Sequence, residues 1–212
     1  MLTLGVDAAR GGWIAVALED GVFADAVLER RFPALLERFP DVAAVGVDVP
    51  IGFPDVGARR RADVAARAVV GARRSSVFFT PPRVAVEAST YGEARALAPG
   101  TSAQGWALRT AMLDVDRVRD AGVYEVHPEV SFAVLAGAPL PFAKRTWNGM
   151  HERIRLLAGA GVDLPHRLDA GLVATDDVLD AAVAAWSATR IARGRHVTFP
   201  PDPRPGEPVI HA

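Results

Sequence analysis

The first thirty residues limit the fold more than any other part of the sequence. Three β-rich runs, TLGVDAA, WIAVALE and VFADAVLE, are separated only by the turn signals RGG and DG. Residues 3–28 are therefore expected to form a three-stranded antiparallel meander. The run FPALLERF then predicts a short helix, and the apolar residues 45–49 predict a buried strand that stops at Pro50. This β-β-β-α-β order indicates an α/β domain with a mixed sheet.

The rest of the chain is mainly helical by pattern. The stretch after Pro54 has helical spacing and ends at Gly71, and a second helical region is expected from about residue 91 to 120. A fifth strand is predicted at Val123–Val126, followed by helices in EVSFAVL, NGMHERIRLLAGAG and TDDVLDAAVAAWSATRIARG. These elements predict one domain over residues 1–199, with a helical insertion at about 55–120 and a Pro-rich tail at 200–212.

Composition excludes several classes of protein. Half of the 212 residues are apolar and the net charge is -1, which suits a globular core. The absence of cysteine excludes disulfides, thiolate nucleophiles and Cys-based zinc sites, and is consistent with a reducing compartment. The sequence has no long apolar run and no basic leader before an apolar segment. A cytoplasmic protein with no membrane partner is therefore expected.

Asp48 is the residue that a purely structural interpretation explains least well. An ionised carboxylate in an apolar strand is costly unless a cation, a donor or a raised pKa offsets its burial, and Pro50 offers no N–H group. Asp7 also ends a strand, and Asp177 and Asp180 are three residues apart, on one face of the last helix. Carboxylates from different elements can converge, and such a cluster needs a cation. Oxygen ligands favour Mg²⁺ or Mn²⁺, one or two ions.

Simpler roles are open for some of these residues. Asp7 could accept hydrogen bonds from the turn that follows it. Asp177 could be no more than a partner of the helix dipole, contributing about 0.3 to 1 kcal/mol. For Asp180, whose neighbours look core-facing, the pattern favours a ligand.

Six motifs, taken in order, resemble one known family. They are GVDAARGGW, VDVPIGFP, RRADVAARAVVGARRSSVF, EVHPEVSF, KRTWNGMHERIRLL and DDVLDA, and they span about residues 4–194. The chain resembles the DUF429 family, regarded as a predicted nuclease group with an RNase H-like fold. In RNase H-like enzymes a first-strand Asp, a fourth-strand carboxylate and one or two carboxylates of the final helix hold the metals. The matching residues are Asp7, Asp48, Asp177 and Asp180.

The resemblance implies metal-dependent hydrolysis of phosphodiester bonds, in which an activated water attacks phosphorus. It also places Glu125, His127 and Glu129 near the metals. His127 could be a general base, a metal ligand or simply a hydrogen-bonded histidine. Lys144, the only lysine of the chain, or an arginine of residues 59–74 would neutralise the charge that develops on phosphorus. The alternative is that Lys144 is an ordinary surface residue.

The stretch from residue 59 to 74 contains six arginines and one aspartate, and could bind nucleic acid. The alternative is a solvated helix face. The candidates for phosphate contact are Arg59, Arg60, Arg61, Arg67, Arg73 and Arg74. Trp106 and Trp147 could stack on bases, although helical spacing is more typical of core tryptophans.

Two other functions are compatible with the sequence. One is a nucleic-acid-binding or interaction module without catalysis, which would bind through the arginines with a salt-dependent affinity. The other is phosphotransfer of the actin-like or sugar-kinase type, which normally needs two such cores. The 212 residues provide room for only one.

Overall fold

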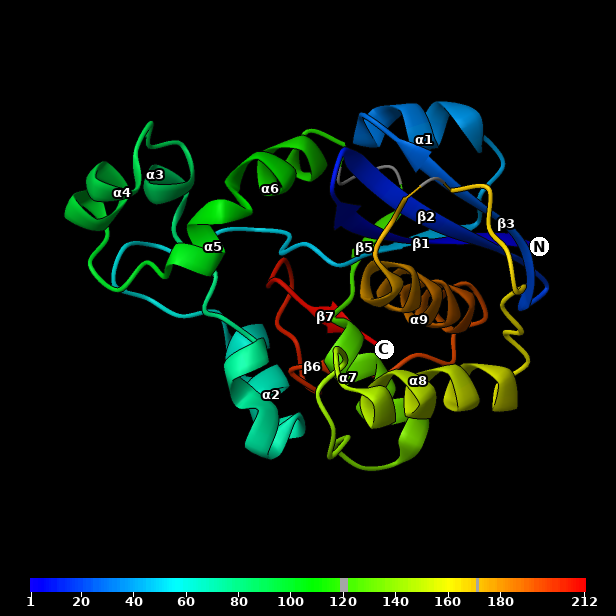
Figure 1. Ribbon diagram of the computed structural model, residues 1–212. Coiled ribbons are helices and arrows are strands. Elements are labelled where there is room, and N and C mark those ends of the chain that lie inside the picture. The colour runs from blue at the N-terminus through cyan, green and yellow to red at the C-terminus, as the bar shows by residue number, and fades with distance from the viewer. Residues whose placement is uncertain (119–121, 171) are drawn as a thin grey trace.

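The centre of the computed structural model, which describes residues 1–118, 122–170 and 172–212, is a mixed five-stranded sheet in the order β3-β2-β1-β4-β5 (Figure 1). The strands are β1 (Leu2–Ala9), β2 (Gly12–Glu19), β3 (Val22–Glu29), β4 (Ala44–Val47) and β5 (Val123–Glu125). The first three form the predicted antiparallel meander, whereas β4 and β5 run parallel to β1. The α/β class and the mixed sheet are thus confirmed.

The turns of the meander follow from backbone geometry. Gly11 and Gly12 have φ values of 96° and 151°, and Gly21 has a φ of 90°. These are left-handed conformations that glycine adopts at little steric cost. Trp13 of β2 packs edge-on against Phe32, at 5.0 Å between ring centroids, which anchors α1 (Phe32–Arg38) to one face of the sheet.

The other face of the sheet is covered by α9 (Thr175–Ala192), whose buried side is rich in alanine. Two glycines allow this helix to approach closely. A Cβ atom on Gly5 would lie 1.9 Å from the Ala185 nitrogen, and one on Gly46 would lie 2.7 Å from the Ala184 oxygen. Gly5 and Gly46 are partners in the β1–β4 register. Any side chain at either position would therefore push α9 away from both strands.

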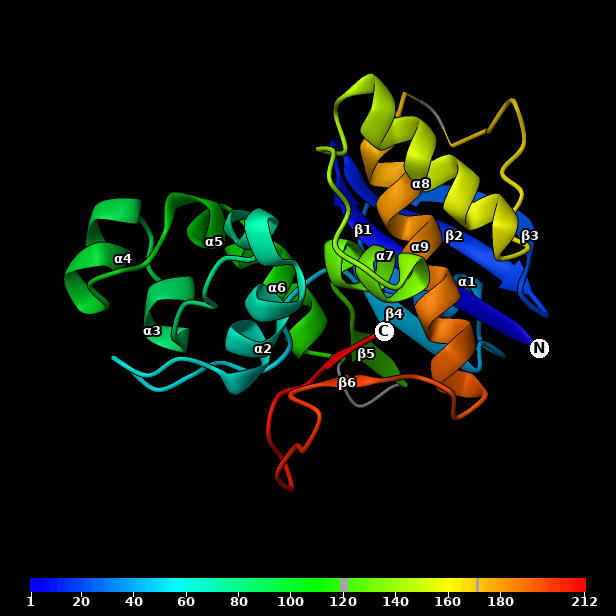
Figure 2. The ribbon, with the colours of Figure 1, turned by 90° about the horizontal axis from the view of Figure 1, so that it is seen from below.

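The segment between β4 and β5 is helical. It contains α2 (Arg61–Val69), the 3-10 helix η1 (Gly71–Ser76), α3 (Arg83–Val86), α4 (Tyr91–Leu97), α5 (Ala103–Ala107) and α6 (Arg109–Asp116). Figures 1 and 2 show α3, α4 and α5 grouped to one side of the sheet. The second predicted helical region, about 91–120, is divided into three short helices, and its last two residues lie outside those that the structure describes.

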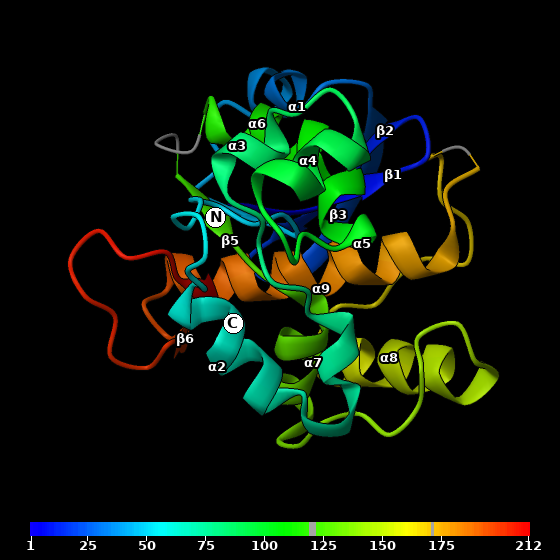
Figure 3. The same cartoon turned by 90° about the vertical axis from the view of Figure 1, so that its left-hand side faces the viewer.

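Two further helices, α7 (Pro128–Ala136) and α8 (Trp147–Gly159), pack on the side of α9 that faces away from the sheet (Figure 3). The segment 200–212, predicted as a tail, returns to the domain. Its end forms β7 (Ile210–His211), which pairs with β6 (Thr198–Phe199), and Val197 and Ala212 exchange backbone hydrogen bonds of 2.8 and 3.0 Å. None of the helices within the described ranges is long and apolar enough to cross a membrane.

Candidate metal centre

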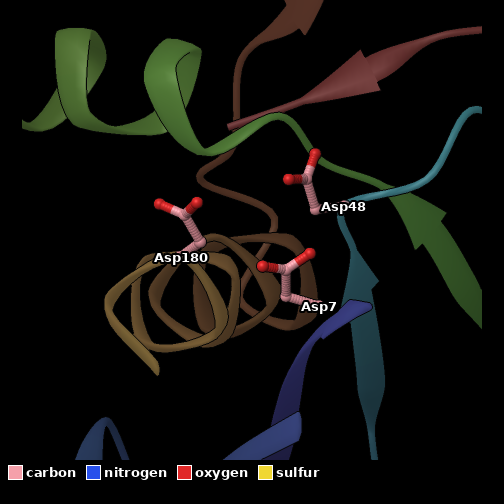
Figure 4. A group of neighbouring side chains, drawn as sticks. All are labelled: Asp7, Asp48 and Asp180. Atoms are coloured by element: carbon pink, nitrogen blue, oxygen red, sulfur yellow. The ribbon is translucent and has the colours of Figure 1, made fainter. Parts of the chain in front are cut away.

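Three aspartates meet at the carboxyl ends of β1 and β4, beside α9. Asp7 lies near the end of β1, Asp48 follows β4, and Asp180 lies in the second turn of α9. One carboxylate oxygen from each lies within 4.8 Å of the others. Figure 4 shows the three side chains gathered around one point. We call Asp7, Asp48 and Asp180 the carboxylate triad.

The local sequence explains why the triad forms. The tripeptide Gly-Val-Asp occurs at residues 5–7 and again at residues 46–48, on neighbouring parallel strands; a third copy, at residues 161–163, lies outside the sheet. The Asp48 N–H donates to the Val6 carbonyl at 2.9 Å and extends the ladder by one residue. Residues two apart on a strand share a face, so each aspartate lies on the face that its glycine opens to α9. The same close packing therefore brings Asp180 against both strand ends.

Burial and repulsion by nearby carboxylates raise the pKa values of all three carboxyl groups. The pKa of Asp7 rises well above its usual range because of burial and the nearby Asp48 and Asp180. Burial raises the pKa of Asp48 to about 7, against the attraction of Lys144. Burial likewise raises the pKa of Asp180 to about 7, again opposed by Lys144. The triad is therefore under-neutralised, and a cation would stabilise its ionised form.

Lys144 partly compensates the triad. Its ammonium contacts the Asp180 carboxylate directly and lies 3.6 Å from Asp176 Oδ2. Burial alone would lower the pKa of Lys144, but the attraction of Asp180, with Asp7 and Asp48, raises it instead. Within the part of the chain that the structure describes, no hydrogen-bond donor reaches the carboxylates of Asp7 and Asp48. One ammonium thus faces three acidic groups whose oxygens are suitable ligands for a metal ion.

Asp177, the fourth predicted ligand, lies apart from this cluster. Its side chain is half-buried, and its oxygens are not among those that converge within 4.8 Å in the described residues. The pKa of Asp177 is raised by burial and by the neighbouring Asp176. Asp177 lies a helical turn from Asp180, nearer the start of α9.

Glu125 lies in the same cavity but is already paired. Arg60 donates to both of its oxygens, at 2.7 and 2.6 Å, and the Ile51 N–H donates to Oε2 at 2.7 Å. Arg60 also contacts Asp63, and all three charged side chains are 2 to 5% exposed. We call Arg60, Asp63 and Glu125 the paired cluster. It joins the start of α2 to β5 and gives Glu125 a structural contact within the fold.

Glu129 is likewise held by arginines. Arg73 donates to its two oxygens at 3.1 Å each, and Arg153 donates to Oε1 at 2.8 Å. The Arg153 side chain is fully buried. These ion pairs connect η1, α7 and α8. Sequence reasoning missed Asp63 and Arg153, because a charged residue on a helix is expected to face solvent.

His127 precedes α7 and, unlike Glu125 and Glu129, has a buried side-chain atom without a partner in the described residues. This atom is Nδ1 of the imidazole. Burial lowers the pKa of His127, against the attraction of Glu129 and Asp180, so the imidazole is neutral near pH 7. The ring thus keeps one nitrogen available for proton transfer.

One cavity of about 210 Å³ connects these groups. All the predicted catalytic residues except Asp177 line it, together with two arginines and several uncharged residues. The charged and ionisable lining residues are Asp7, Asp48, Arg60, Asp63, Arg73, Glu125, His127, Glu129, Lys144 and Asp180.

The arginine stretch does not form a continuous phosphate-binding face. Arg60 and Arg73 are bound to the glutamates, and Arg61 pairs with Asp202 at 2.8 Å and Glu207 at 3.0 Å. Arg67 donates to the Val77 carbonyl. The exposed members are Arg59, whose guanidinium lies 4.0 Å from the Phe79 ring centroid, and Arg74. Four of the six predicted phosphate-binding arginines are thus directed toward acidic partners or carbonyls, and two are exposed.

The fold and the site together define an α/β protein with a mixed sheet and a buried carboxylate triad that could hold a metal ion. The chain belongs to the DUF429 family, described as a protein of unknown function, whose model matches residues 5–204. No curated protein matches the chain significantly, and neither does any solved structure.

Proposed function

We propose that this protein is a metal-dependent nuclease that hydrolyses phosphodiester bonds at the carboxylate triad. The observation that carries the proposal is the convergence of three carboxylate oxygens within 4.8 Å from two parallel strand ends and one helix. The β-β-β-α-β element order, followed by a later strand and by α9, agrees with the order that the family resemblance implies for an RNase H-like fold and supports the proposal. A fold does not determine a function by itself, so the proposed nuclease activity depends on the carboxylate triad.

Asp7, Asp48 and Asp180 would hold one or two Mg²⁺ or Mn²⁺ ions. The fit is good, because all three donors are hard oxygen ligands and two of them lack a hydrogen-bond donor in the described structure. A bound divalent ion would supply Lewis-acid chemistry to the phosphodiester. The pKa values of about 7 mean that Asp48 and Asp180 release protons when a cation binds near neutral pH.

The other residues of the cavity have separate roles in this proposal. Lys144 exchanges Asp180 for a phosphate oxygen of the substrate and neutralises its negative charge. His127 is neutral and has a free ring nitrogen, so it accepts or donates a proton inside the cavity. Glu125 and Glu129 bind Arg60 and Arg73, and these ion pairs hold the helices that line the cavity in place.

The test is cleavage of labelled single-stranded, duplex and branched DNA and RNA with Mg²⁺ or Mn²⁺. Asp48→Asn removes a charge and preserves the shape, and Asp55→Asn, at an exposed position seven residues later, is the matched control. We expect metal-dependent cleavage by the wild type and Asp55→Asn, and a loss of at least about 100-fold in Asp48→Asn. Absence of cleavage on every substrate, or full activity of Asp48→Asn, would reject the proposal. Binding without cleavage would indicate a non-catalytic nucleic-acid-binding module.

A further inference from the structure

The largest exposed aromatic side chain lies beside the cavity. Trp147, the first residue of α8, is 73% exposed, although helical spacing favoured a core position. It lines a groove whose walls come from the start of α8, the preceding loop and the start of α9. The groove residues are Lys144, Arg145, Thr146, Trp147, Met150, Thr175 and Asp176. Tryptophan is enriched at binding surfaces, and Trp147 is exposed beside charged groups.

The Trp147 ring is held in place by its neighbours. His151, one turn later, packs against it at 4.0 Å between ring centroids. Thr146 caps α8 by accepting a hydrogen bond of 3.2 Å from the Gly149 N–H. A Cβ atom on Gly149 would lie 2.0 Å from the Ala143 oxygen, so the loop is tightly packed against the helix. An exposed ring on such a support loses little freedom when a ligand stacks on it.

The groove adjoins the carboxylate cavity, because Lys144 lines both. The next residue, Arg145, has an 81% exposed side chain. It uses Nε to donate to Asp176 at 2.8 Å, and its two terminal nitrogens have no protein partner among the described residues. A cation that can bind phosphate therefore lines the same groove as the aromatic ring.

We propose that this groove binds one unpaired nucleotide of the strand that is cleaved. Its base stacks on Trp147, and its phosphate accepts hydrogen bonds from Arg145. This inference rests on the proposed nuclease function and names its substrate as single-stranded DNA or RNA. A duplex is excluded because its base faces are already covered by neighbouring base pairs, whereas a single strand offers an open π-face.

Binding can be measured without cleavage, by fluorescence anisotropy of a labelled short single strand in EDTA. A second strand of the same length, with abasic sites in place of all bases, removes stacking and keeps the phosphates. We expect Trp147→Ala to weaken binding of the normal strand about tenfold and to leave the abasic strand unchanged. Trp147→Phe retains a ring and should keep most of the affinity.

Val22→Ala is the matched control. Val22 is 59% exposed and begins β3, next to the Asp20 carbonyl that accepts a hydrogen bond from Arg193 after the end of α9. It therefore lies at the end of α9 opposite the groove, and its replacement should leave the affinity unchanged. A thermal melt of each variant checks that it is folded.

The outcomes separate this inference from the nuclease proposal. Three results would overturn the proposed nucleotide binding. They are unchanged affinity in Trp147→Ala, an equal loss of affinity for normal and abasic strands, and no binding by the wild type. Base-dependent binding that Trp147→Ala abolishes would support the groove, even if no metal restored cleavage. Cleavage by the wild type together with unchanged binding by Trp147→Ala would retain the nuclease and reject the groove.

Discussion

The carboxylate triad and the paired cluster line the same cavity, yet their charges are balanced differently. In the paired cluster, Arg60 lies between Asp63 and Glu125 and donates to both. In the triad, three carboxylates share the single ammonium of Lys144, which contacts only Asp180 directly. The paired cluster contributes to the fold as it stands, whereas the triad is costly to bury without a further cation. The residual negative charge therefore distinguishes the candidate metal site from the structural ion pairs.

Breaking the paired cluster should have the largest effect on stability. Arg60→Met leaves two buried carboxylates without their guanidinium and should lower the free energy of unfolding by about 3 to 5 kcal/mol. Arg61→Met, the adjacent control, removes ion pairs of a side chain that is 37% exposed, and should cost less than about 1 kcal/mol. Urea denaturation measures both. Equal losses would contradict the view that the buried ion pairs of Arg60 stabilise the fold more than the exposed ones of Arg61.

Adding a divalent cation tests the triad directly. At about 100 times its dissociation constant, Mn²⁺ or Mg²⁺ should stabilise the wild type by about 2.7 kcal/mol. Asp7→Asn and Asp48→Asn should abolish this gain, while Asp177→Asn, outside the converging oxygens, should keep most of it. Thermal melts with and without metal give the values. A complete loss in Asp177→Asn would add that residue to the ligand set.

Removing one triad charge in metal-free protein should be stabilising. Burial raises the pKa of Asp48 from 3.8 to about 7, so its stabilising protonation is complete below pH 3.8 and is lost as the pH rises through about 7. Asp48→Asn escapes this loss and should be more stable than wild type by on the order of 2 kcal/mol at about pH 8. The two proteins should converge near pH 4. Melting curves in EDTA between about pH 4 and pH 8 measure this difference. A variant less stable than wild type at high pH would contradict the view that the Asp48 charge destabilises the metal-free protein.

The smallest expected effect concerns Lys144. If its ammonium occupies part of the cation site, Lys144→Met should strengthen Mn²⁺ binding several-fold, an effect of about 1 kcal/mol. Cleavage should fall at the same time, because the charge that faces the substrate phosphate is lost. Titration calorimetry with Mn²⁺ and the cleavage assay provide the two readouts. Weaker Mn²⁺ binding would show that Lys144 orients Asp180 for the metal and does not compete with it.

The sequence was sufficient for the elements whose signals are local. The turns of the meander contain glycine, and the strand at Asp48 is apolar with a proline at its end, so both could be recognised without tertiary information. The prediction of a functional role for Asp48 rested on the same local feature, a carboxylate in an apolar strand. The Gly-Val-Asp tripeptides of β1 and β4 were a weaker local signal, because the same tripeptide at residues 161–163 lies outside the sheet.

The rest of the site depends on partners that are distant in the sequence. Arg60 and Glu125 are 65 residues apart, and nothing near Arg60 distinguishes it from the more exposed Arg59 and Arg61. Arg60 is a charged residue that is buried, and Trp147 is the reverse case. Its helical spacing indicates a core residue, but its side chain is exposed at the start of α8. Burial is a property of the packed fold, and a helical pattern shows only which residues share a face.

The two close approaches of α9 to Gly5 and Gly46 also determine when the site can appear during synthesis. β1 and β4 come from the first part of the chain, but the helix that completes the triad begins only at Thr175. Contacts between such distant segments form late, because long loops must close first. A growing chain would therefore have two of the three carboxylates and much of its sheet while lacking a complete metal centre. On the proposed function, nuclease activity would be absent until α9 had been made and had packed against the two glycines.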